Sequence, residues 1–200
     1  MDKKIYGMPL LIGVTSDINL ENLERMMMNH ITHYIFSNID YLGNNIDISY
    51  FPEKIFEKIV TTRRGICLDL NYSFSLFLTS QGYENYMVKC FRPGSRSEKR
   101  NVFHLGIIAI LDNRKYFVDV GYGDYFTKPL LLTGIVRHRL YVRKTPLNII
   151  DLTITIEDIS DNYLKIAKTK PDDLALRNVK YERIYDIHME EYVIPTLSKF

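Results

Sequence analysis

Three residues in the middle of the sequence have the chemical types of a nucleophile, a base and an orienting acid. Cys67 stands in the first turn of a predicted helix, and Arg63, Arg64 and Gly65 precede it by four, three and two positions. Unpaired N–H groups at a helix start, the helix dipole and neighbouring cations all favour a thiolate there. His104 begins a long apolar strand and Asp119 ends the next one. These types point to acyl transfer through a cysteine.

The spacing of the histidine and the aspartate supports their cooperation. The turn Asp112-Asn113-Arg114 joins their two predicted strands into a hairpin, and adjacent antiparallel strands lie about 5 Å apart. A carboxylate can then orient the imidazole, whose other nitrogen takes the proton of a thiol. Each residue alone is also typical of a core cysteine, a structural histidine or a turn aspartate. Together they predict a triad of Cys67, His104 and Asp119.

The elements before Gly82 have helical spacing, with apolar residues recurring at steps of three and four. Asn19 is a predicted N-cap, Pro52 suits a first helical turn, and Gly82 is a natural stop. The segment Ile5–Val14 is apolar but contains glycine and proline, and it is too short to span a membrane. The three predicted apolar faces are Leu20, Leu23, Met26, Met27 and Ile31; Ile55, Phe56, Ile59 and Val60; and Cys67, Leu70, Phe74, Phe77 and Leu78.

The elements after Gly82 alternate between apolar and polar residues, which predicts strands. The segment Phe91–Asn101 contains Pro, Gly, Ser and basic residues and is predicted to be an exposed loop. Tyr163–Lys170 is predicted as a short helix, and Asn178–Ile187 as helix or strand. Helices followed by an antiparallel sheet make an α+β arrangement. The predicted strands are Met87–Arg92, Val102–Leu111, Lys115–Val120, His138–Arg143 and Ile149–Ile156.

Composition narrows the class of protein. The chain has 200 residues, enough for one domain or two small subdomains that share a core. Its 26 basic and 24 acidic side chains give a net charge of +2, so no strong field favours nucleic acid or a membrane as partner. Two cysteines provide neither a disulfide framework nor a four-thiolate zinc site. We expect a cytoplasmic protein without a metal.

The triad lies within motifs that resemble those of the arylamine N-acetyltransferase family. The family motif R-G-G-x-C-x-E-x-N matches Arg63–Asn71, with Arg64 in place of the second glycine and Asp69 in place of the glutamate. The later signature, a histidine opening a strand and then D-V-G-F-G, matches His104 and Asp119–Gly123. Upstream, Ile35–Ile39 keeps the Phe and Asn of P-F-E-N-L. The resemblance runs from about residue 20 to 132.

The resemblance implies a cysteine-protease-like core. In this arrangement an N-terminal helical bundle bears the nucleophile and an antiparallel β-barrel bears the histidine and aspartate, with a short C-terminal lid-like region. We therefore expect three parts: residues 1–82 as the helical subdomain, 83–157 as the barrel subdomain, and 158–200 as the C-terminal region.

The resemblance also implies an activity. Family members take an acetyl group from acetyl-CoA onto the cysteine and pass it to the nitrogen of an aromatic amine or hydrazine. Cys67 would carry the acetyl group, with its backbone N–H in the oxyanion hole, and His104 would act as base and acid, oriented by Asp119. Arg63 would be an ion-pair partner near the site, with Asp69 as one candidate partner.

The binding residues follow from the same resemblance. Phe36 and Tyr122 would line the acceptor pocket, and Phe103, Arg100 and Gly123 would border the CoA cleft.

Several alternatives remain open at the level of sequence. The triad could serve other cysteine-based acyl transfer, amide formation or hydrolysis, or the chain could be an inactive family member that acts as a binding protein. The basic loop Arg92–Arg100 is either a solvated loop or a site for CoA phosphates. His30 and His33, one helical turn apart, fit core or surface packing better than a metal site. Cys90 fits a core position, and monomer and dimer are both compatible with the sequence.

Overall fold

The computed structural model describes residues 2–41, 51–91, 104–122, 127–132, 138–145, 148–160, 163–170 and 180–191. Within these residues the fold consists of helices followed by an antiparallel sheet, as the α+β prediction expects. The helical elements are α1 (Asp2–Leu10), α2 (Leu20–His33), the short 3-10 helix η1 (Ile39–Tyr41), α3 (Pro52–Thr62) and α4 (Cys67–Ser80).

The three predicted helices form, and their local signals act as expected. Asn19 caps α2, because its side chain accepts a hydrogen bond from the backbone N–H of Asn22 at 2.8 Å. Pro52 occupies the first turn of α3, and Gly82 follows the end of α4 with a φ of +86°. Helix α1 was not expected, because Gly7 and Pro9 interrupt its sequence. It forms by packing: a Cβ added to Gly7 would lie 2.8 Å from the ring of Phe77.

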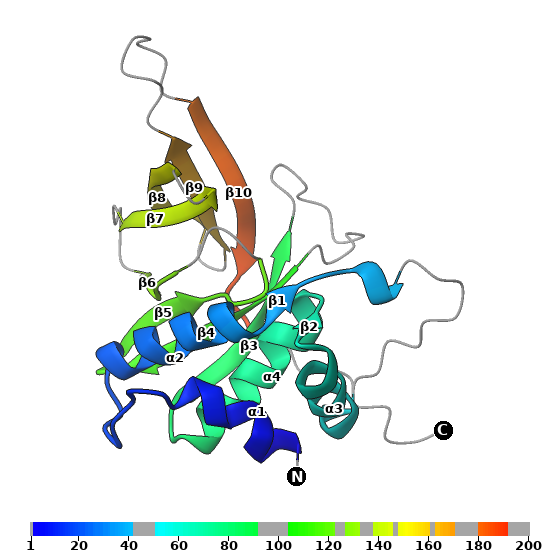
Figure 1. Cartoon of the computed structure of the whole chain (residues 1–200). Helices are drawn as coiled ribbons and strands as arrows, with labels where there is room; N and C mark the ends of the chain where they lie inside the picture. The colour runs from blue at the N-terminus through cyan, green and yellow to red at the C-terminus, as the bar shows by residue number, and fades with distance from the viewer. Residues whose placement is uncertain are drawn as a thin grey trace, which may run out of the picture.

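Helix α4 lies at the centre of the molecule, against β3 and β4, with α1, α2 and α3 around it (Figure 1). Its apolar side chains are buried on more than one side, as Leu68 and Leu70 show, because two residues that are two positions apart point to opposite sides of a helix. A helix that is apolar on most faces belongs in the core. Its first residue, Cys67, is therefore attached to the most rigid element of the fold.

The main sheet has eight strands in the order β6-β5-β4-β3-β10-β9-β8-β7. The order is linear, and no pairing among the described strands joins β6 to β7, so the predicted closed barrel is not confirmed. In Figure 1, β7, β8 and β9 project away from the helices. The strands are β3 (Glu84–Phe91), β4 (His104–Leu111), β5 (Arg114–Val118), β6 (Leu130–Leu131), β7 (His138–Thr145), β8 (Asn148–Ser160), β9 (Tyr163–Lys170) and β10 (Lys180–His188).

The predicted hairpin is present as β4 and β5. Asp112 and Asn113 both have positive φ, 49° and 59°, which is the backbone of a two-residue turn matched to the twist of the strands. The register pairs Ile107 with Val118. His104 precedes this pair on β4 and Asp119 follows it directly after β5, so the two residues are diagonal neighbours.

The C-terminal part of the sequence corrects one prediction. Tyr163–Lys170 is strand β9 and not a helix, and β10 decides the ambiguous segment in favour of a strand. Both strands are paired on two sides, because β9 lies between β8 and β10 and β10 lies between β9 and β3. Hydrogen bonding on both edges outweighs a weak local preference for helix. The three-part division of the chain stays a prediction.

A second, two-stranded parallel sheet lies beside the start of α4. It pairs β1 (Ile35–Phe36) with β2 (Arg64–Gly65). The backbone N–H of Ser37 also donates to the carbonyl of Gly65 at 2.9 Å. Strand β2 is thus held in place by β1 just before the chain enters the helix at Cys67.

Candidate active site

Cys67 is the first residue of α4, at the turn between β2 and the helix. Ile66 precedes it with an extended backbone (φ −82°, ψ 175°), and the carboxylate of Asp69 accepts a hydrogen bond from the Ile66 N–H at 3.0 Å. This carboxylate caps the helix start and is favourably placed for the helix dipole. The cysteine itself is partly buried and is not in a disulfide. Its thiol is therefore held at a fixed place without being sealed in the core.

His104 and Asp119 form a buried pair. The ring nitrogen Nε2 of His104 lies 2.7 Å from Oδ2 of Asp119, and the two residues are 4% and 2% exposed. Because a carboxylate only accepts hydrogen bonds when ionised, Nε2 carries the proton. The carboxylate thus fixes the orientation of the imidazole.

The cysteine is the second partner of this imidazole. The side chains of Cys67 and His104 are hydrogen-bonded. Since Nε2 faces Asp119, Nδ1 is the ring nitrogen left for the sulfur. Burial by itself lowers the pKa of His104, but the negative charges and hydrogen bonds of Asp119 and Cys67 outweigh it and raise the pKa to about 10. His104 therefore holds a proton at neutral pH.

Asn71 connects the helix to both strands of the triad. It lies one turn after Cys67 on α4, and its Nδ2 donates to Asp119 Oδ1 at 2.9 Å and to the Leu105 carbonyl at 2.6 Å. Its Oδ1 accepts from the N–H of Val120 at 2.8 Å. Asn71 is fully buried, so these bonds are shielded from water. We missed its role in the sequence, although a polar residue on a buried helix face is the signal that marks it.

Gly121 brings the loop after β5 close to the helix start. Its N–H donates to Asp119 Oδ1 at 2.9 Å. A Cβ added at this position would lie 2.9 Å from the Cα of Cys67 and 2.7 Å from Asn71 Nδ2. Only glycine fits such a close approach of two backbones. The glycine therefore allows the aspartate and the cysteine to share one site.

A second polar cluster supports the helix start from the other side. Asp69, 2% exposed, accepts from Lys58 Nζ at 2.5 Å and from the hydroxyl of Tyr41 at 2.8 Å. Lys58 also donates to the Tyr41 hydroxyl and lies 4.0 Å from the centre of its ring. Burial and the charge of Asp69 raise the pKa of Tyr41, so it stays a neutral donor. Nothing in the sequence pattern marks Lys58, which lies on an ordinary charged helix face.

Several known proteins are similar to this chain in sequence and fold. A family model described as N-acetyltransferase matches residues 19–140, more than half of the chain. The chain belongs to the arylamine N-acetyltransferase family. It is 36% identical to an uncharacterized acetyltransferase of Acanthamoeba polyphaga mimivirus over 197 residues, which cover 88% of this chain and 97% of that protein.

More distant relatives of the arylamine N-acetyltransferase family match over less of their length. Arylamine N-acetyltransferase 1 of Oryctolagus cuniculus is 31% identical over 110 residues, 53% of this chain and 37% of that enzyme. The structure of the Mycobacterium marinum enzyme in complex with CoA has a TM-score of 0.72 at 19% identity, over 95% of this chain and 66% of that one. The chain thus spans less than half the length of the rabbit enzyme.

Two departures from the arylamine N-acetyltransferase motif now have structural counterparts. Arg64, in place of a glycine, forms an ion pair with Asp40 of η1, with Nη2 and Oδ1 2.7 Å apart. Asp69, in place of the glutamate, is paired with Lys58. The proposed pairing of Asp69 with Arg63 is therefore wrong: Lys58 reaches the carboxylate from the facing helix α3, and Arg63 lines a hollow elsewhere.

The structure describes two of the five expected binding residues, Tyr122 and Phe36. The ring of Tyr122 meets that of His104 edge-on, with centroids 5.5 Å apart and planes at 81°. Phe36 lies in β1 opposite Gly65 and is 48% exposed. Both are thus next to elements that hold the triad. Phe103, Arg100 and Gly123, like the loop Arg92–Arg100, lie outside the described residues.

Cys90 and His30 are interior residues, and His33 lies at the end of α2. Cys90 is fully buried, and burial together with the charge of Asp119 raises the pKa of its thiol well above the usual value. His30 is fully buried among aromatic rings, and His33 hydrogen-bonds the Asn29 carbonyl at 2.7 Å. The described part of the chain has no group of three or more His, Cys, Asp or Glu able to hold a metal ion. It also has no helix with the length and apolar character that a membrane span requires.

Proposed function

We propose that this protein moves an acetyl group from acetyl-CoA to the nitrogen of an arylamine or hydrazine, through a thioester on Cys67. The observation that supports this most is the position of His104, hydrogen-bonded to Cys67 on one side and to Asp119 on the other. A buried imidazole between a thiol and a carboxylate suits nucleophilic acyl transfer. The family and its CoA complex support the choice of donor.

The first half-reaction loads the enzyme. The thiolate of Cys67 attacks the carbonyl carbon of the acetyl thioester, and the carbon–sulfur bond to CoA breaks as the tetrahedral intermediate collapses. The leaving CoA sulfur takes the proton of the His104 imidazolium. The products are free CoA and acetyl-Cys67, with a neutral imidazole whose orientation Asp119 maintains.

The second half-reaction transfers the acetyl group. The acceptor nitrogen attacks the acetyl carbon of acetyl-Cys67, and the neutral His104 takes the proton that the nitrogen loses. The thioester bond breaks, and the departing Cys67 thiolate again pairs with the imidazolium. The two substrates never need to be bound together, so the kinetics are ping-pong.

The start of α4 provides the oxyanion site in this proposal. The first N–H groups of a helix have no acceptor within the helix, and that of Cys67 is next to the attacked carbon. Phe36 and Tyr122 are the proposed acceptor-pocket residues, and Phe103, Arg100 and Gly123 the proposed CoA contacts. Since both cysteines are free thiols, we also infer a reducing, cytoplasmic location.

Intact-protein mass spectrometry tests the loading step. Incubation with acetyl-CoA should add the mass of one acetyl group to the wild-type protein and to Cys90→Ser, and none to Cys67→Ser. Parallel reactions with propionyl-, butyryl- and malonyl-CoA determine whether the donor is acetyl or another acyl group. Absence of any adduct on folded wild-type protein would contradict the proposal and favour a binding protein. The loaded enzyme is then offered aniline and phenylhydrazine, which should remove the added mass and become acetylated.

A further inference from the structure

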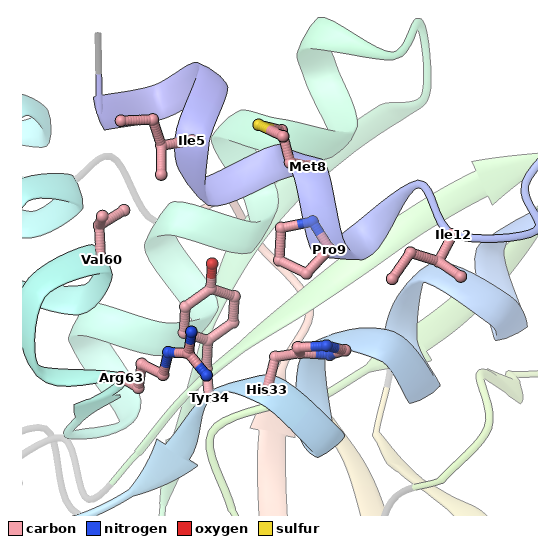
Figure 2. Close-up of a pocket in the computed structure, with 8 residues that line it drawn as sticks. All are labelled: Ile5, Met8, Pro9, Ile12, His33, Tyr34, Val60 and Arg63. Atoms are coloured by element: carbon pink, nitrogen blue, oxygen red, sulfur yellow. The ribbon is translucent and has the colours of Figure 1, made fainter.

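A hollow lies in the helical part of the fold, between α1 and the C-terminal ends of α2 and α3 (Figure 2). Its volume is about 540 Å³, within the range of pockets that hold small organic molecules. Cys67, His104 and Asp119 are not among the described residues that line it. The hollow is therefore separate from the candidate active site, and nothing in the proposed reaction uses it.

One wall of the hollow is made of exposed apolar side chains. Ile5, Met8 and Ile12, from α1 and the turn after it, are 43%, 66% and 60% exposed. Figure 2 shows Ile5 and Met8 across the hollow from Val60 and the ring of Tyr34. Large apolar side chains that gather around a concavity, instead of lying scattered, mark a binding surface.

The base of the hollow is rigid. Tyr34 is 5% exposed, its ring stacks on that of Tyr6 with centroids 4.9 Å apart, and its hydroxyl donates to the Tyr6 carbonyl at 3.0 Å. The ring therefore offers a fixed aromatic surface. A preformed surface loses little conformational entropy when a ligand binds.

The charge at the edge of the hollow is positive. Arg63 ends α3, and its backbone is held on both sides: its N–H donates to the Ile59 carbonyl at 2.7 Å, and its carbonyl accepts from Ile35 at 3.0 Å. Its side chain is exposed, and in the described part of the chain no carboxylate pairs with it, whereas its neighbour Arg64 is paired. His33 is the other basic residue of the lining, and none of the eight described lining residues is acidic.

We propose that this hollow binds a small aliphatic carboxylate, with the carboxylate on Arg63 and the chain between α1 and Tyr34. The planar guanidinium matches a carboxylate with two parallel hydrogen bonds. The apolar wall then covers the aliphatic part. An amine of the same length meets a like charge at the edge, and an alcohol lacks the ion pair, so the anion binds in preference to both.

The wild-type protein tests the location directly. Methyl-resolved NMR of the full chain, with Ile, Met and Val labelled, is recorded during titration with octanoate below its micelle-forming concentration. The methyl signals of Ile5, Met8, Ile12 and Val60 should shift and saturate, and octylamine at equal concentrations should shift them less. Absence of saturation, equal shifts with octylamine, or shifts confined to residues outside the hollow would overturn the proposal.

Substitution of the arginine tests the charge. Arg63→Met keeps the length of the side chain and should weaken octanoate binding by about fivefold, the scale of an exposed ion pair. Arg114→Met, which removes an exposed arginine at the start of β5, should leave the affinity unchanged. Thermal unfolding of both variants verifies the fold. Equal affinity for octanoate in the two variants would contradict the role given to Arg63.

Discussion

His30 should make the protein lose stability in mild acid. This side chain is fully buried, with its ring against those of Tyr6, Tyr34 and Phe74 at centroid distances of 5.8, 5.2 and 5.2 Å. Neither of its ring nitrogens has a hydrogen-bond partner in the described part of the chain. Burial, with a smaller contribution from His33, lowers the pKa of His30 from 6.5 to about 3. The folded protein therefore keeps this ring neutral where an unfolded chain would charge it.

The size of the effect follows from the two pKa values. A base whose pKa is lower in the folded state binds its proton more readily in the unfolded state, so stability falls as the pH falls below 6.5. Each pH unit between 6.5 and about 3 removes about 1.4 kcal/mol from the free energy of unfolding. The loss from this one group is then about 2 kcal/mol at pH 5, and about 5 kcal/mol once the pH is below 3.

Urea unfolding at pH 7 and pH 5 measures this difference. His30→Leu removes the titrating group and fills the same apolar space. Between pH 7 and pH 5, the free energy of unfolding of this variant should fall by about 2 kcal/mol less than that of wild type. His33→Leu, at the end of the same helix, serves as the control and should lose nearly as much stability as wild type, because His33 makes only the smaller contribution to the pKa of His30. If wild type and His30→Leu lose the same stability on acidification, the reasoning from burial is refuted.

Two further predictions concern the candidate site. Asp119→Asn removes the charge that raises the pKa of His104, so the imidazolium should be lost at lower pH. Alkylation of Cys67 by iodoacetamide at pH 6 should then be slower than in wild type. The rate of acetyl transfer should fall by about 100-fold or more. An unchanged alkylation profile would contradict the triad. Lys58→Met removes the cation from the buried Asp69 carboxylate, which keeps its hydrogen bonds from Tyr41 and Ile66, and should lower the free energy of unfolding by about 2 kcal/mol in urea titrations. The exposed Lys54→Met should change it little, and equal effects would refute the assignment.

Much of the local structure could be predicted from sequence because its signals are local. The cap at Asn19, the apolar face of α2 and the two-residue turn at Asp112 each depend on residues within a few positions of one another. The same holds for the helix-start cysteine and its flanking glycine. The triad itself was predicted by combining such local motifs, and their order along the chain carried the family resemblance.

Only the tertiary structure decided which distant residues meet. Asn71 bridges α4 to both strands of the triad, and Lys58 rather than Arg63 reaches Asp69. Nothing in the local spacing specifies these partners, because long polar side chains can turn to several neighbours and the packing of whole helices determines which one is in reach. Strand β9 was missed for a related reason, since pairing on both edges of a strand outweighs its own weak preference. The sequence by itself determined which residue types are available for the proposed chemistry, and the packing of α4 against the hairpin determined that Cys67, His104 and Asp119 lie together.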